Sequence, residues 1–146
     1  MIRKKMFVRS EEGNTIAYKI SSEMCHVDRV VEQCKEDLSR FNISSNSPEL
    51  KVILRELLNN AVKHGNHEII EKTVTCSIAY MGARRFKVTV EDQGKGFHYS
   101  NIDMDLPKDT ERVSRRGYAL IKALSNKIEF NEKGNRISAY IEIHYE

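Results

Sequence analysis

The sequence lacks the features that would mark a disulfide-bonded, membrane-spanning or secreted protein. It contains only three cysteines, an odd number, and no two of them are separated by two residues. Such cysteines suggest neither a disulfide framework nor a thiolate zinc site, so we expect reduced thiols, as in a cytoplasmic protein. No apolar run approaches the roughly 18 residues of a membrane span, and none follows the charged N-terminal residues as in a signal peptide.

Signatures of nucleic-acid binding and of two common nucleotide-binding loops are also missing. The net charge is +3, and the basic residues are spread along the chain apart from Arg3–Lys5 and the group Arg112, Arg115 and Arg116. Without a basic stripe or a nucleic-acid-binding motif, we expect no direct nucleic-acid partner. No Gly-x-Gly-x-x-Gly opens a helix after a strand and no Gly-Lys-Ser/Thr occurs, which excludes Rossmann and Walker loops.

The composition that remains is that of a globular protein. Of 146 residues, 40% are apolar and 31% are charged, which favours a folded chain over a disordered one. This length suffices for one compact domain and is too short for two ordinary ones. Since we see no repeats, low complexity or internal linker, we expect a single domain over residues 1–146.

The spacing of apolar residues predicts alternating pairs of strands and helices. A first helix is capped by Ser21 or Ser22, after a strand hairpin. A second helix begins at Pro48, after the cap Ser47, and ends at Gly65. The predicted strands span 7–9, 15–20, 73–80, 86–91, 128–130 and 137–145, and the predicted helices span 23–41, 48–65 and 118–124.

This order of elements predicts a two-layer α/β sandwich, with a mixed, mostly antiparallel sheet and helices on one face. Neighbouring strands are joined by short turns, which favours antiparallel pairing. Residues 97–114 lose all periodicity and are predicted to form a long loop. Loops of that length in compact domains are often lids or binding loops.

Polar residues lie along one edge of the predicted second helix: Glu56, Asn60 and Lys63. An amide oxygen suits Mg²⁺, which holds nucleotide phosphates through few protein ligands, and a neighbouring carboxylate can accept a proton. An ordinary solvated helix face has the same spacing, so this pattern alone leaves both interpretations open. His64 has no second histidine at ligand spacing, which disfavours zinc.

A second polar cluster, Asp92, Gly94 and Gly96, follows the strand at 86–91. Glycines let the backbone turn tightly and let a flat ring approach. A buried carboxylate there can accept a hydrogen bond from an exocyclic amine such as that of adenine. A simple turn built from aspartate and glycine is the alternative interpretation.

A third feature is the start of the last predicted helix, where Arg115 and Arg116 precede Gly117. A helix N-terminus with arginines beside it is suited to binding an anion such as a phosphate. A solvated, charged helix start would have the same sequence, so the anion site is a hypothesis.

In combination, these features resemble the ATP-binding superfamily of gyrase, MutL and histidine kinases, which shares the Bergerat fold. The resemblance rests on an asparagine box and two glycine boxes, in this order: Glu56-x-x-x-Asn60, Asp92-x-Gly94-x-Gly96 and Arg116-Gly117. Within the superfamily, the run Asn-Ala-x-x-His-Gly-Asn and the short length look most like the bacterial anti-sigma-factor serine kinases. The resemblance covers about residues 5–145.

The resemblance implies an ATP-dependent protein serine/threonine kinase that uses Mg²⁺. Asp92 would recognise the adenine amino group, Asn60 would hold the magnesium, and Glu56 would be the catalytic base. The remaining residues implied in the nucleotide pocket or its lid are Lys63, Gly94, Gly96, Arg115, Arg116, Gly117 and Asn135. The implied partners are an anti-anti-sigma protein as substrate and a sigma factor, and the family also suggests a second copy of the chain as a homodimer partner.

Two positions depart from the family pattern. Arg115 stands where the second glycine box usually has its first glycine, and Gly134-Asn135 stands where Gly-Thr is common. That threonine commonly supports the adenine-binding aspartate, so either Asn135 substitutes for it or the support is lost. These departures favour an alternative function, a nucleotide-binding switch without phosphoryl transfer. A histidine-kinase catalytic domain is a third alternative, but the helical histidine, His26, falls inside the domain and is predicted at the surface.

Overall fold

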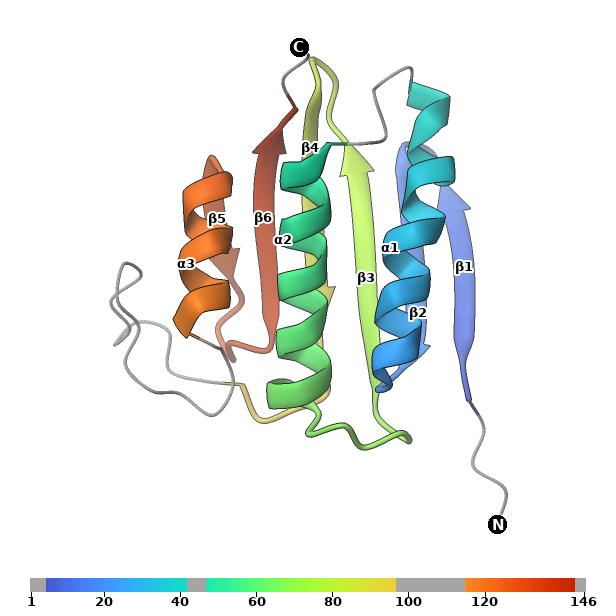
Figure 1. The fold of residues 1–146 in the computed structure, drawn as a ribbon, viewed down its shortest axis with the longest axis vertical. Helices are drawn as coiled ribbons and strands as arrows, with labels where there is room; N and C mark the ends of the chain where they lie inside the picture. Colours follow the sequence, from blue (N-terminus) through green and yellow to red (C-terminus); the bar gives the residue numbers. More distant parts are fainter. Residues whose placement is uncertain (1–4, 42–46, 97–114, 144–146) are drawn as a thin grey trace.

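The computed structural model describes residues 5–41, 47–96 and 115–143, and within them six strands form one sheet in the order β1-β2-β3-β4-β6-β5. Every strand pairing is antiparallel, and the helices α1, α2 and α3 lie on one face of the sheet (Figure 1). The predicted two-layer architecture is therefore confirmed, and the sheet of the described residues is wholly antiparallel where a mixed, mostly antiparallel one was predicted.

The elements have the following bounds. The strands are β1 (Phe7–Glu12), β2 (Thr15–Ser21), β3 (Thr73–Tyr80), β4 (Arg85–Glu91), β5 (Lys127–Phe130) and β6 (Arg136–Glu142). The helices are α1 (Met24–Leu38), α2 (Pro48–Asn59) and α3 (Arg115–Leu124), with a 3-10 helix at Ser39–Phe41 and a π-helix at Asn60–Gly65. The predicted loop at 97–114 and the end of the last predicted strand, residues 144 and 145, lie outside the described residues.

The sheet is built from hairpins whose alternating apolar residues face the helices. In β2, Ile16, Tyr18 and Ile20 are fully buried, whereas Lys19 on the opposite face is exposed. The helices bury matching apolar stripes against these strands, as the helical spacing predicts. The stripes comprise Val27, Val30, Val31, Cys34 and Leu38 in α1, and Leu50, Ile53, Leu54, Leu57 and Leu58 in α2.

The last hairpin brings distant residues of the chain together. β4 pairs with β6 rather than with β5, so β5 lies at the edge of the sheet and Glu91 faces Arg136. The residues just beyond this pair, Asp92 and Asn135, are consequently neighbours. No helix in the described part of the chain is long and apolar enough to cross a membrane.

The start of α1 differs from the prediction of a serine cap. Glu23 occupies the N-cap position and its side chain makes no capping hydrogen bond. Ser21 Oγ instead accepts a hydrogen bond from the Met6 N–H (3.1 Å), and Ser22 Oγ donates one to the Lys72 carbonyl (2.6 Å). The second helix begins as predicted, since Ser47 Oγ accepts from the Leu50 N–H (3.3 Å).

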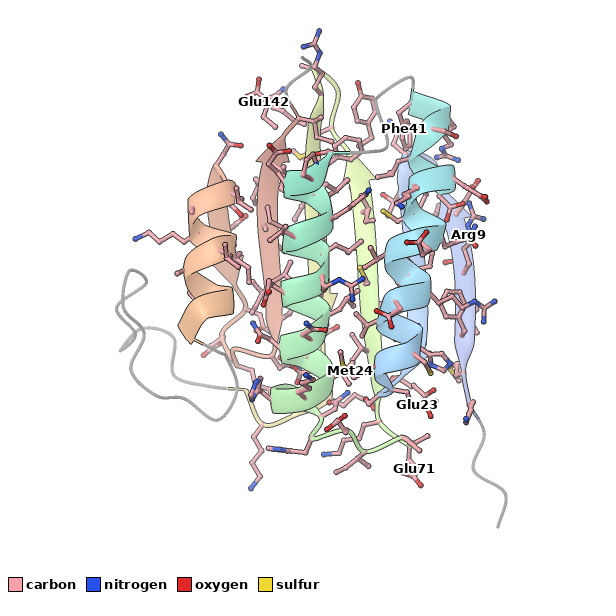
Figure 2. All side chains as sticks on the ribbon, viewed as in Figure 1. Arg9, Glu23, Met24, Phe41, Glu71 and Glu142 are labelled. Atoms are coloured by element: carbon pink, nitrogen blue, oxygen red, sulfur yellow. The ribbon has the colours of Figure 1, made fainter. Side chains whose placement is uncertain are left out.

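A charged network connects the edge strand β1 to α1. The Tyr18 hydroxyl and Arg9 Nε (2.9 Å) both donate to Asp37 Oδ2, and Arg40 Nη1 donates to Glu11 Oε2 at 2.8 Å. Figure 2 shows Arg9 on β1 beside α1. Burial by itself would raise the pKa of the Asp37 carboxyl, but the hydrogen bonds from Arg9 and Tyr18 outweigh it and hold that pKa below its ordinary value.

We expect this network to make stability depend on pH. Because the folded pKa of Asp37 lies below its unfolded value of about 3.9, the carboxylate stabilises the fold fully above that value. This stabilisation is lost as the pH falls through the folded pKa. Asp37→Asn should lower the free energy of unfolding at pH 7 by about 1–3 kcal/mol. Urea titrations from pH 7 to about pH 2 should show the two proteins converging in acid, and a constant difference would contradict this.

Candidate functional site

The helix that carries the first polar cluster changes its winding at Asn60. α2 ends at Asn59, and the chain continues as a π-helix to Gly65, where helical structure ends as predicted. The π winding itself was not predicted. Such turns are rare and often lie at functional sites, because they re-aim side chains within a helix. Here Asn60 is buried, with 4% of its surface exposed, whereas Lys63 is exposed.

Asn60 and Asp92 line one cavity, at the end of the sheet where β4 ends and β6 begins. The other lining residues come from the helix, from β4 and β6 and from the turn before β6: Leu57, Ala61, Val90, Gly134, Asn135 and Ile137. The walls are therefore mostly apolar, with two amides and one carboxylate as polar groups. The enclosed part measures about 20 Å³, which is room for about one water molecule, so any larger ligand would extend beyond it.

The Asp92 carboxyl packs directly against the backbone of Gly65. A Cβ at Gly65 would lie 2.2 Å from Asp92 Oδ2 and 2.3 Å from its Cγ, which leaves no space for any side chain. Gly96 makes a similar approach, since it has φ +78° and its Cβ would lie 1.9 Å from the Lys133 carbonyl oxygen. Each glycine thus allows contact between segments that are distant in sequence.

Hydrogen bonds hold the main chain of Asp92 against the turn before β6. The Asp92 N–H donates to the Asn135 carbonyl (2.9 Å), and Asn135 Nδ2 donates to the Asp92 carbonyl (2.8 Å). Asp92 Oδ1 also accepts from the N–H of Gly94 at 2.7 Å, and Gly94 is buried. Asn135 therefore holds the main chain of Asp92. The bond from Nδ2 requires the side-chain amide of an asparagine at this position.

Of the other predicted site residues whose side chains the structure describes, Glu56, Lys63 and Gly117 are not among those that line the cavity. Glu56 is half-buried on α2, one turn before Asn60. Gly117 is buried near the start of α3, the helix that packs against α2. Arg115 and Arg116 are the first residues of α3, and their side chains lie outside the described part of the structure. The roles of these residues in nucleotide binding, like that of the exposed Lys63, stay predictions.

The apolar lining of the cavity was not identified from the sequence. Val90 and Ile137 are directly paired between β4 and β6, and Leu57 and Ala61 belong to the buried stripe of the helix. Their hydrophobic spacing marks them as core residues, which is a detectable signal. Their presence beside Asp92 depends on the pairing of β4 with β6, which sequence spacing does not reveal.

A separate group of metal-type donor atoms lies at the start of α1, where Figure 2 labels Glu23. Donor atoms of Glu23, Cys25 and His26 lie within 4.8 Å of one another. Sulfur and nitrogen donors do not suit Mg²⁺, so this group is distinct from the implied magnesium site.

The predicted surface histidine, His26, is half-buried. Its Nδ1 lies 3.1 Å from Ser21 Oγ, and its ring packs edge-on against Phe7, with the ring centroids 5.9 Å apart.

The cysteines are free, as predicted. Burial raises the pKa of the Cys34 thiol to about 12, which keeps it protonated and unreactive at neutral pH. Burial also raises the pKa of Cys76. Neither buried thiol is therefore a candidate nucleophile for the site.

Comparison with known proteins supports the same architecture. Residues 20–141 match the family model of a histidine kinase-like ATPase domain. Among solved structures, the histidine kinase domain of the blue-light activated histidine kinase of Erythrobacter litoralis EL346 is similar, with a TM-score of 0.53 and 16% identity. The match covers 85% of this chain and 62% of that one, and shows a shared fold. No curated protein matches the chain in sequence.

Proposed function

Because the chain belongs to the histidine kinase-like ATPase domain family, we propose that its cavity binds ATP with Mg²⁺ and that it phosphorylates a serine or threonine of a partner protein. The observation that carries the proposal is the cavity shared by Asn60 and Asp92. These residues come from the asparagine box and the first glycine box, so the two sequence boxes converge in space.

Asp92 is the residue proposed to recognise the base. Its carboxylate lies on a floor with apolar walls and packs against the Gly65 backbone, and its main chain is held by Asn135. An ionised carboxylate only accepts hydrogen bonds, so it favours the exocyclic amine of adenine over the carbonyl at the same position of guanine. Because a purine is larger than the enclosed space, the ring would lie towards the open side of the cavity.

Asn60 and Glu56 are the residues proposed to serve the phosphates. The Asn60 amide offers the kind of oxygen ligand that Mg²⁺ prefers, which fits the implied metal. When bound, Mg²⁺ would neutralise phosphate charge that develops during transfer. Glu56 lies four residues earlier, on the same side of the helix. We assign it the role of general base, which accepts the proton of the attacking hydroxyl.

The proposed partners follow from the resemblance to anti-sigma-factor serine kinases. An anti-anti-sigma protein would be the substrate, and its phosphorylation would add roughly −1.5 to −2 charges and break its complex with the kinase. The released kinase would then capture a sigma factor in the cytoplasm. A second copy of the chain is also a proposed partner, because β1 lies at the sheet edge and is exposed from Val8 to Glu12.

A nucleotide-binding switch without phosphoryl transfer is the second candidate. Arg115 favours it, because a side chain replaces a glycine at the start of α3. The departure at Asn135 argues less for it, because the Asn135 side chain donates a hydrogen bond to the Asp92 main-chain carbonyl. A histidine-kinase role is less well supported, because His26 lies inside the domain on α1 and packs against Phe7.

Transfer of label from γ-³²P-ATP to a purified candidate anti-anti-sigma protein tests the proposal. We expect Mg²⁺-dependent label that survives acid and is released by base, as for phosphoserine. Acid-labile label would instead indicate phosphohistidine and a histidine kinase. ATP binding without label on any candidate would favour the switch without transfer.

A further inference from the structure

A closed ring of three hydrogen bonds lies next to Asp92. The Gln93 N–H donates to Asn66 Oδ1 at 2.8 Å, and Asn66 Nδ2 donates to the Thr73 carbonyl at 3.0 Å. The Thr73 N–H closes the ring by donating to Gln93 Oε1 at 2.7 Å. The ring therefore joins the residue after the π-helix, the first residue of β3 and the residue that follows Asp92.

Asn66 is the buried centre of this ring. It is fully buried, and its Nδ2 also donates to Ser22 Oγ at 2.9 Å, which in turn donates to the Lys72 carbonyl at 2.6 Å. A buried amide with all its polar atoms engaged is held rigidly, because each broken bond leaves a desolvated group without a partner. The ring is consequently anchored to the start of α1 as well as to β3.

Gln93 belongs to the same ring but, unlike Asn66, lies at the surface. Its side chain is exposed, so it contributes little to the hydrophobic core, yet its Oε1 accepts the bond from Thr73. This makes Gln93 a residue that can be changed without disturbing the interior. It is also the first of the two variable residues in the Asp-x-Gly-x-Gly box, a position to which the sequence pattern assigns no role.

The ring and Asn135 hold Asp92 from two sides. Asn135 binds the N–H and the carbonyl of Asp92, at 2.9 and 2.8 Å, and the ring fixes the next residue through the Gln93 N–H. The Asp92 carboxylate is packed against Gly65, so a small displacement of Asp92 would make the carboxylate clash with Gly65 or lose contact with it. Binding and catalytic geometries are sensitive to shifts on the order of 1 Å.

We propose that Asn66 and Gln93 are positioning residues that set the selectivity of the site for adenine over guanine nucleotides. This inference rests on the proposed function, because it assumes that Asp92 contacts the base. In this proposal the two residues act on the base contact through the main chain of the Asp92 loop. Loss of the ring would allow Asp92 to shift, which weakens the bond to the adenine amine more than it weakens contacts to the phosphates.

The test compares two substitutions of Gln93. Gln93→Leu keeps the approximate size but removes the acceptor for the Thr73 N–H, whereas Gln93→Glu retains an acceptor. We expect Gln93→Leu to weaken ATP binding about five- to tenfold, the cost of roughly one hydrogen bond, and to reduce the ATP-to-GTP preference by a similar factor. Gln93→Glu should restore the preference to within about twofold of wild type. Calorimetric titration with ATP and GTP measures both quantities.

A matched control is Gln33→Leu, the same exchange on α1, where Gln33 Nε2 lies 3.5 Å from Asp37 Oδ1. This variant should bind both nucleotides as wild type does. If Gln93→Leu lowers the melting temperature but leaves the ATP-to-GTP preference unchanged, the ring is only structural and the inference is wrong. If the wild-type protein binds neither nucleotide, the proposed function fails and the inference fails with it.

Discussion

Gly65→Ala should weaken ATP binding by about 10- to 100-fold, the cost of losing one hydrogen bond to a charged group. The added Cβ would lie 2.2 Å from Asp92 Oδ2, so the carboxylate or the helix end has to move. The main chain of Asp92 is held by Asn135 and the ring beside it, so the side chain is the part expected to rotate away. Calorimetric titration with ATP measures the loss, and the ATP-to-GTP preference should fall with it.

Gly13→Ala is the matched control for this substitution. Gly13 lies in the β1–β2 turn with φ +57°, and a Cβ there meets nothing within 4 Å. Alanine is strained at that backbone angle, so the control should lose about 1–2 kcal/mol of stability. Its ATP affinity should be unchanged. If Gly65→Ala bound ATP as tightly as wild type, the close packing of Gly65 on Asp92 would have no importance for the nucleotide site.

Glu56→Gln should lower kcat for phosphoryl transfer by about 10²- to 10⁴-fold, the usual contribution of a general base. The KM for ATP should change little, because the proposed proton transfer occurs in the transition state and not in the bound ground state. Steady-state transfer from labelled ATP to the partner protein measures both constants. Glu56 is half-buried on α2, and glutamine keeps its size, so the fold should be retained.

A suitable control for Glu56 is Glu32→Gln, on the exposed side of α1, where Glu32 pairs with Lys35 at 3.4 Å. Exposed pairs of this kind contribute about 0–1 kcal/mol, so this variant should transfer phosphate at the wild-type rate. Full activity in Glu56→Gln would show that another group takes the proton. An equal loss in both variants would point to general damage to the fold.

The parts of the fold that were predictable from sequence are those with local causes. Ser47 and Pro48 start α2 as predicted, because capping depends on the adjacent backbone N–H groups. The hairpins follow from alternation of apolar residues and from their turns. Asn60 and Asp92, two of the predicted site residues, line one cavity, but their convergence was expected from a family resemblance and not from spacing.

The parts that were missed have nonlocal causes. Ser21 and Ser22 have the residue type of a helix cap, but each bonds to a segment that reaches it only in the folded chain. Asn66 follows the glycine that ends the helix and looks like a turn residue. In the folded chain it is fully buried and hydrogen-bonded to Thr73 and Gln93. Local propensity cannot predict such bonds, because their partners depend on strand order.

The π-helix at Asn60–Gly65 is a further case. Its residues fit an α-helix by propensity and spacing, and the altered winding is seen only in the folded structure. The contact of Gly65 with Asp92 is likewise invisible in sequence, where Gly65 signals only the end of a helix. The candidate site thus depends on the π-helix and on the contact of Gly65 with Asp92, neither of which local sequence signals predict.

The central claim is that Asn60 and Asp92 serve one nucleotide. Calorimetric titration with ATP, with and without Mg²⁺, tests it on the wild-type protein and on Asn60→Ala. We predict one ATP per chain, tighter binding with Mg²⁺ in the wild type, and loss of this Mg²⁺ effect in Asn60→Ala while binding of metal-free ATP persists. The claim would be contradicted if the wild type bound no ATP, or if Asn60→Ala kept the full Mg²⁺ effect.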